Sequence, residues 1–184
     1  MNAIFKGIRP LDYVLAVLAT GAGVFLMIEN INATNAHGLS HSLSTHTWAM
    51  LPVFLAVTVP ILWRRRNILA VVGVTAVAAA AHVLLFGWLT RCGVVLPLSF
   101  ALAYAVARFA RGGRDQLIGL AGILVLLVVT LLRDSSATFT GAMPIAVAGA
   151  AIFYGIGRFV QVRVNKKASQ QVREEQPAAT AVAA

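Results

Sequence analysis

The chain has 184 residues, of which 59% are hydrophobic and 11% are charged, and its mean hydropathy is +0.83. Soluble domains carry about a quarter charged residues, so this composition excludes an ordinary water-soluble globule. The net charge is +9, but no nucleic-acid-binding motif accompanies it, so we expect no nucleic acid partner. The single cysteine, Cys92, excludes an intramolecular disulfide and a cysteine-based zinc site.

Six apolar segments qualify, some narrowly, as membrane spans, which take about 20 residues. In chain order they are Leu11–Ile31, Trp48–Trp63, Ile68–Leu89, Val94–Ala110, Leu117–Leu132 and Ala142–Val160. The second and fifth are short, so flanking residues must extend them toward the headgroups. We predict an all-α integral membrane bundle of six transmembrane helices in three hairpins over residues 1–163. A short basic tail follows over residues 164–184, helical at first and disordered after Pro177.

The basic residues predict the orientation of these spans. Every Lys and Arg except Arg91 and Arg133 falls on one side of the alternating spans. Because cytoplasmic loops are enriched in Lys and Arg, both termini are expected in the cytoplasm of a bacterial plasma membrane. Anionic lipid headgroups are the expected counter-charge at that face.

A secretory signal peptide is the alternative interpretation of the first segment. Lys6 and Arg9 precede the apolar run, and small residues follow it in the sequence ATNA. Cleavage there would leave five spans. The run is longer than a usual signal core and begins with Asp12, which favours a retained helix.

The loop between the first two spans, NATNAHGLSHSLSTHTW, carries three of the four histidines: His37, His41 and His46. His37 and His41 stand four residues apart, which would put both imidazoles on one face of a helix. Imidazoles bind zinc or copper, and they also titrate near neutral pH. The loop is therefore a candidate metal site or proton sensor, and the alternative is a flexible polar loop.

Four further residues at the outer ends of the spans are candidate ligand contacts. His82 lies in the third span, where ionisable groups are either functional or bonded across helices. Glu29 could pair with Arg91 or with Arg133 and so join two hairpins, although exposed charges more often face the headgroups. Asp12, at the opposite end, is interpreted as a local partner of Arg9. The chain has no GxxxxGK[ST], HExxH or GxSxG motif, so no catalytic residue, cofactor or bound metal is predicted.

Four stretches, RPLDYVLAVLAT, LPVFLAVTVPILWRRRNILAVV, HVLLFGWLTRCGVVLPLSFALAYAVARFARGGR and FYGIGRFV, carry a family resemblance. Over about Arg9–Arg163 the chain resembles the N-terminal membrane region of actinobacterial two-component sensor histidine kinases. The resemblance implies a signal-input module. In that family the last membrane helix continues into a dimerising helix with the phosphoacceptor histidine, and an ATP-binding domain follows.

These 184 residues depart from the family pattern after Arg163. No histidine lies on the predicted cytoplasmic side, and the remaining residues cannot hold an ATP-binding domain. We therefore expect a non-catalytic membrane protein that senses a signal or modulates a partner. A homodimer or a partner membrane kinase is the interaction that the resemblance implies.

Two other functions stay open from the sequence alone. A small transporter or channel subunit would need a polar path near His82, Thr130 and Thr20. A metal-binding membrane protein would need the three loop histidines to converge.

Overall fold

The structure, a computed structural model, describes residues 8–33 and 39–182, with side chains described up to residue 171. Its helices are α1 (Pro10–Asn32), α2 (Met50–Thr58), the 3-10 helix η1 (Val59–Trp63), α3 (Ile68–Phe86), α4 (Cys92–Phe109), α5 (Gly113–Leu131) and α6 (Phe139–Val182). No strand occurs in the described ranges, where the one β-bridge pairs Leu89 with Asp134. The all-α prediction is confirmed for these residues.

Among the described residues, five helices are long and apolar enough to cross a membrane, namely α1, α3, α4, α5 and the Phe139–Gln171 part of α6. The second predicted span differs, since α2 supplies nine α-helical residues and η1 adds five in 3-10 form. Pro60 stands in the first turn of η1, where its missing N–H is tolerated. At 1.5 and 2.0 Å per residue the pair is about 24 Å long, against a hydrocarbon core of about 30 Å.

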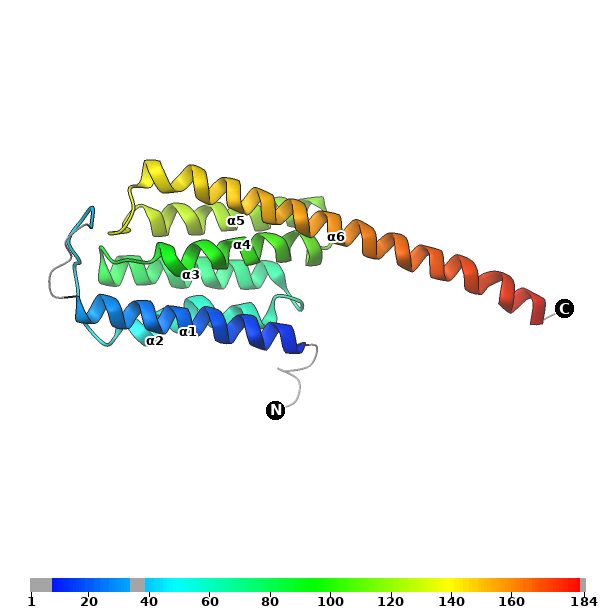
Figure 1. Cartoon of the computed structure of the whole chain (residues 1–184), viewed down its shortest axis with the longest axis horizontal. Helices are drawn as coiled ribbons and strands as arrows, with labels where there is room; N and C mark the ends of the chain where they lie inside the picture. Colours follow the sequence, from blue (N-terminus) through cyan, green and yellow to red (C-terminus); the bar gives the residue numbers. More distant parts are fainter. Residues whose placement is uncertain (1–7, 34–38, 183–184) are drawn as a thin grey trace.

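The helices form two layers of three. In one layer α4 lies between α1 and α6, and in the other α3 lies between α2 and α5 (Figure 1). Consecutive helices run antiparallel, as the predicted hairpins require. The most extensive packing nevertheless joins helices of different hairpins, α4 with α6 and α3 with α5. The hairpins are therefore interlocked across the layers.

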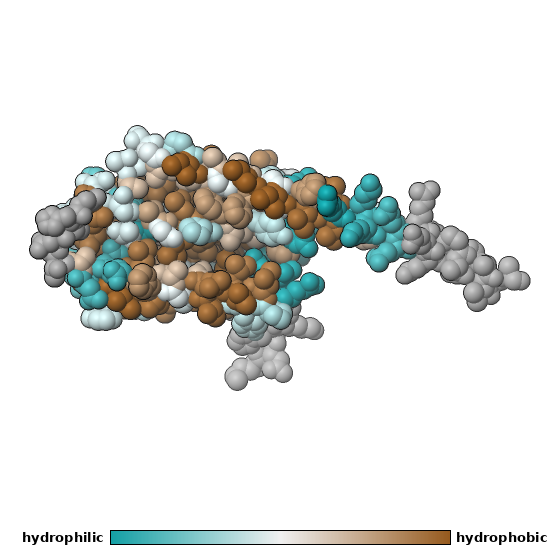
Figure 2. Space-filling model, in the orientation of Figure 1, coloured by the Kyte–Doolittle hydropathy of each residue, from teal (hydrophilic) through white to brown (hydrophobic). Residues whose placement is uncertain are grey.

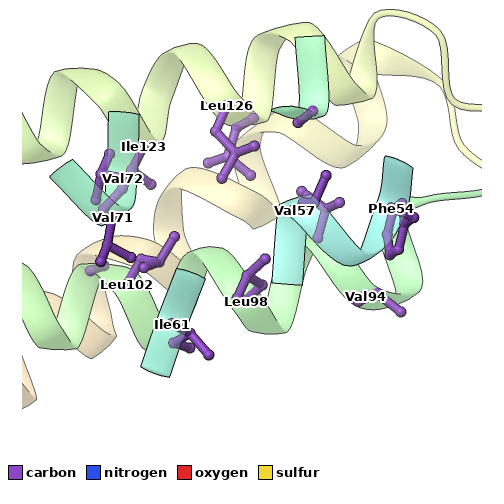
Figure 3. Packing of buried hydrophobic residues seen from close by; sticks show 14 of the residues in the cluster. Phe54, Val57, Ile61, Val71, Val72, Val94, Leu98, Leu102, Ile123 and Leu126 are labelled. Atoms are coloured by element: carbon purple, nitrogen blue, oxygen red, sulfur yellow. The ribbon is translucent and has the colours of Figure 1, made fainter. Parts of the chain in front are cut away.

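The interior is an apolar cluster contributed by every helix. Leu98 and Leu102 of α4 are almost fully buried, and they pack in one core with Ile61 of η1, Val71 of α3 and Leu126 of α5 (Figure 3). The outer surface of the bundle is also apolar, with exposed side chains such as Leu84 and Val17 (Figure 2). An apolar belt around a packed bundle is the surface that lipid chains cover.

Helix α6 is longer than the bundle. Its 44 residues correspond to about 66 Å, so the C-terminal part projects beyond the other helices (Figure 1). Hydrophilic residues cover the exit of this part from the bundle (Figure 2). The predicted end of the helix at Pro177 is wrong for this structure, because α6 continues to Val182. A proline removes one backbone hydrogen bond, and the alanines that follow favour helix.

Close packing of α4 against α6 depends on glycines. A Cβ atom on Gly157 would lie 2.7 Å from the carbonyl oxygen of Tyr104, and one on Gly149 would clash with the Phe100 ring. Within lipid, apolar burial does not favour helix association. Small residues favour it instead, because they let two backbones approach closely and gain van der Waals contacts. Gly155, two residues before Gly157, meets nothing within 4 Å of such an atom.

We expect Gly157→Ala to destabilise the bundle by about 1–3 kcal/mol, because the methyl group meets rigid backbone. Gly155→Ala is the matched control on the same helix. It should be neutral or slightly stabilising, since alanine exceeds glycine by about 1 kcal/mol in helix propensity. Thermal unfolding in detergent micelles measures both. Equal unfolding midpoints for the two variants would contradict the assigned α4–α6 contact.

Candidate functional site

The end of the bundle away from the α6 projection is closed by three loops that bond to one another. The backbone N–H of Ser40 donates to the Ser135 carbonyl at 2.9 Å, and the Ser135 N–H donates to the Leu89 carbonyl at 3.1 Å. The Ser44 N–H donates to the Trp88 carbonyl at 2.9 Å, and the Trp88 N–H donates to the Ser44 hydroxyl at 2.9 Å. The loops before α2, α4 and α6 therefore form one connected structure.

Asp134 is the centre of this end and is fully buried. Its Oδ2 accepts from the backbone N–H groups of Arg91 at 2.8 Å and Cys92 at 2.7 Å. Its Oδ1 accepts from the N–H of Ser136 at 2.9 Å and from the Ser136 hydroxyl at 2.6 Å. The N–H groups of Arg91 and Cys92 stand at the start of α4, where N–H groups have no partner within the helix and the helix dipole favours negative charge. The carboxylate thus joins the loop before α6 to the start of α4.

The Arg91 side chain is 1% exposed and all its donor atoms have partners. Its Nε donates to His82 Nδ1 at 3.0 Å, its Nη1 to the Arg133 carbonyl at 3.0 Å and its Nη2 to the Gly87 carbonyl at 2.8 Å. Burial lowers the pKa of Arg91 to about 10, while the charge of Asp134 opposes that shift. The guanidinium therefore stays charged at neutral pH.

His82 is the neutral partner of that guanidinium. Its Nδ1 accepts a hydrogen bond from Arg91 Nε. The proton of the neutral imidazole is therefore on Nε2. Nε2 is buried near the backbone of Met50 without a well-formed hydrogen bond. The rings of Phe54 and Phe86 pack on the imidazole, with centroids 5.2 and 4.9 Å away. The hydrogen-bond partner of His82 is thus Arg91 in the loop between α3 and α4, from which His82 accepts, whereas the sequence suggested a bond donated across helices.

Asn30 ties α1 to the same cluster. Its Nδ2 donates to the Thr90 carbonyl at 2.9 Å, and its Oδ1 accepts from the Thr90 N–H at 3.1 Å. The Asn30 carbonyl accepts from His46 Nδ1 at 2.9 Å. One asparagine therefore bonds the loop before α4 and the histidine loop to the end of α1.

The other predicted residues lie apart from one another. His41 is exposed and stacks on Trp88 with ring centroids 3.8 Å apart. His46 bonds to Asn30 as described, and His37 lies outside the described residues. Within the described ranges no three His, Cys, Asp or Glu side chains gather to hold a metal ion.

The sequence left two alternatives open for Glu29, a pair with Arg91 or Arg133 and an exposed side chain. Glu29 is exposed, and the described residues include no ion pair between it and Arg91 or Arg133. The Arg133 side chain is also exposed, and only its carbonyl takes part in the cluster. The tie between helices at this end is made instead by Asp134, Arg91 and Asn30.

Polar groups of the interior have separate partners. Thr20 and Thr58 share a hydrogen bond of 3.1 Å between their hydroxyls, while Thr130 donates to Leu126 in its own helix at 2.7 Å. His82 bonds to Arg91. Among the described residues, Thr20, Thr130 and His82 thus have three different hydrogen-bond partners, and no hydrogen bond links one of them to another.

The opposite, basic end carries a second buried carboxylate that the sequence analysis misinterpreted. Asp12 is fully buried and accepts from Arg64 Nε at 2.8 Å and Arg65 Nε at 2.8 Å. From Arg9 it receives only the backbone N–H, at 2.9 Å. The long-range pair with Arg64, which is 3% exposed, replaces the predicted local pair. An acid within the first turn of an apolar segment is the signal that could have indicated a buried partner.

We expect Asp134→Ala to cost about 3 kcal/mol or more, since hydrogen bonds to charged groups contribute about 1.5–3 kcal/mol each. Arg133→Ala is the matched neighbour and removes only an exposed side chain. It should change the free energy of unfolding by less than about 0.5 kcal/mol. Thermal unfolding in detergent separates the two. An equal loss in both variants would show that Asp134 does not hold the loops together.

Comparisons of this chain with protein-family models, with curated proteins and with solved structures find no match. The function therefore has to be inferred from the geometry of the two polar ends and of the helix that connects them.

Proposed function

We propose that this chain is a non-catalytic signal-input module of a bacterial plasma membrane, with six membrane-crossing segments and both termini in the cytoplasm. In this proposal α2 and η1 together form the second span, which is short. The distribution of charge supports the orientation, because the basic residues of the described loops concentrate at the end from which α6 projects. The resemblance to sensor kinase membrane regions supports the input role.

The observation that carries this proposal is the continuity of α6. The helix starts at Phe139, five residues after Asp134, and runs without a break through the bundle and beyond it (Figure 1). A rigid helix transmits a displacement at one end to the other. Whatever shifts the loop that holds Asp134 therefore moves the projecting part of α6.

The histidine loop is in direct contact with the start of this path. The backbone N–H groups of Ser40 and His41 both donate to the Ser135 carbonyl, at 2.9 and 3.4 Å. A ligand or proton bound by this loop would favour one arrangement of these contacts over another and so shift the population of α6 positions. His41 and His46 are the described imidazoles available for such binding.

The projecting part of α6 is the proposed output. Val162 and Val164 are 58% and 44% exposed there, beside Arg163, Lys166 and Lys167. A lone helix in water gains little stability without a packing partner. We propose that a second copy of the chain or a partner membrane kinase covers this segment.

The orientation is tested with single cysteines in a Cys92→Ser background. Ser42→Cys in the histidine loop should react with a membrane-impermeant maleimide in intact bacterial cells. Ser169→Cys on α6 should react only after the cells are permeabilised. The reverse pattern would contradict the proposed orientation, and labelling of both in intact cells would contradict six spans.

The coupling is tested with spin labels at Arg114→Cys and Ser169→Cys in the same background, reconstituted in lipid nanodiscs. Asp134→Asn removes the charge that holds the start of α4, so the distance distribution between the labels should shift or broaden. Arg133→Ala should leave it unchanged. Pulsed electron paramagnetic resonance measures both. A distribution that Asp134→Asn does not change would overturn the proposed transmission through α6.

A further inference from the structure

Two hollows at the basic end of the bundle share two lining residues. One has a volume of about 170 Å³ and lies between the starts of α3 and α5, where Arg66, Asn67, Phe109, Arg111 and Asp115 line it. The other, of about 420 Å³, runs along α3 beside η1. Arg66 and Asn67 line both hollows, so a molecule bound against these two residues at the start of α3 reaches both.

The smaller hollow is positively charged. Arg66 and Arg111 contribute two guanidinium groups to its lining, against the single carboxylate of Asp115. The Phe109 ring of the same lining carries two more guanidinium groups, with Arg65 4.9 Å and Arg108 5.8 Å from its centroid. Of these two, Arg65 is paired with Asp12, while Nη1 of Arg108 is buried with no hydrogen-bond partner among the described residues. The hollow thus attracts an anion, and guanidinium groups suit the oxygens of a phosphate.

The larger hollow is an apolar groove. Beyond Arg66 and Asn67 it is lined by Pro60 and Trp63 of η1 and by Ala70, Val71 and Val74 of α3. Residues 67, 70, 71 and 74 follow one another along one face of α3 and lead from the basic end toward the middle of the bundle. The groove therefore begins at a polar hollow and continues into the apolar layer.

We propose that these hollows form one binding site for an anionic phospholipid, with the phosphate between Arg66 and Arg111 and an acyl chain along Trp63 and Val74. A free phosphate ion would leave the groove unused. A zwitterionic lipid would bring its cationic group toward four arginines. Basic pockets between membrane helices are known to bind anionic headgroups. The site does not depend on the proposed signalling role or on which face of the membrane it lies.

Trp63 provides the probe, because Trp48 and Trp88 lie at the opposite end and can be replaced by phenylalanine. In the Trp48→Phe, Trp88→Phe protein, vesicles of phosphatidylcholine containing a minor fraction of dibrominated phosphatidylglycerol should quench the remaining fluorescence. Dibrominated phosphatidylcholine at the same fraction should quench it far less. Two guanidinium contacts predict a preference for the anionic lipid on the order of tenfold.

Two charge-matched double variants decide the outcome. Arg66→Gln with Arg111→Gln should abolish the preference, and both side chains are exposed, so the fold should persist. Lys166→Gln with Lys167→Gln removes the same charge from α6 and should leave the preference intact. Equal losses in the two variants would overturn the site, because the preference would then follow net charge alone. Loss of the preference on addition of inorganic phosphate at constant ionic strength would overturn the assignment to a lipid.

Discussion

The carboxylate of Asp134 determines how the end of the bundle opposite the α6 projection is built. Apolar helices gain nothing from the hydrophobic effect by meeting one another in lipid, so their ends need specific polar contacts to fix their relative positions. Asp134 accepts two backbone N–H groups at the start of α4 and two donors of Ser136, and it does so while fully buried. The buried guanidinium of Arg91 lies near the same carboxylate and extends the network to His82.

Both ends of the bundle are held by a buried carboxylate and a buried arginine. The backbone supplies most of their hydrogen-bond partners at one end, and the two side chains pair directly at the other. At the outer end a carboxylate binds amides and the guanidinium binds carbonyls, so the loops themselves are held. At the basic end Asp12 binds two guanidinium groups directly, so α1 is held to the turn after η1. Between them the helices meet mainly through glycines and apolar side chains, with the hydrogen bond between Thr20 and Thr58 joining α1 to α2. Movement of α6 is therefore restrained by loop contacts at its start and by close packing against α4 along its length.

Much of this fold follows from the sequence because length and apolarity decide whether a segment crosses a bilayer. Five of the predicted segments correspond to helices that meet those requirements, with ends that differ by a few residues apart from the extension of α6. The site was less predictable. Arg133 and Asp134 are adjacent in a loop, the first exposed and the second buried. A loop has no helical periodicity in its sequence from which that difference could be predicted. The contact of Asp12 with Arg64 spans 52 positions in sequence, so the position of Asp12 in an apolar segment could indicate a buried partner but not which arginine it is.

The short second helix links the buried ion pair to the lipid groove. Together α2 and η1 reach about 24 Å, which is about one helical turn shorter than a hydrocarbon core of about 30 Å. Arg64 points inward and pairs with Asp12. A charged side chain buried among apolar helices needs such a partner of opposite charge. Arg66, two residues later, faces the hollows beside α3. A lipid bound in the groove would lie against Trp63 of η1 and Val74 of α3, which line it among the described residues.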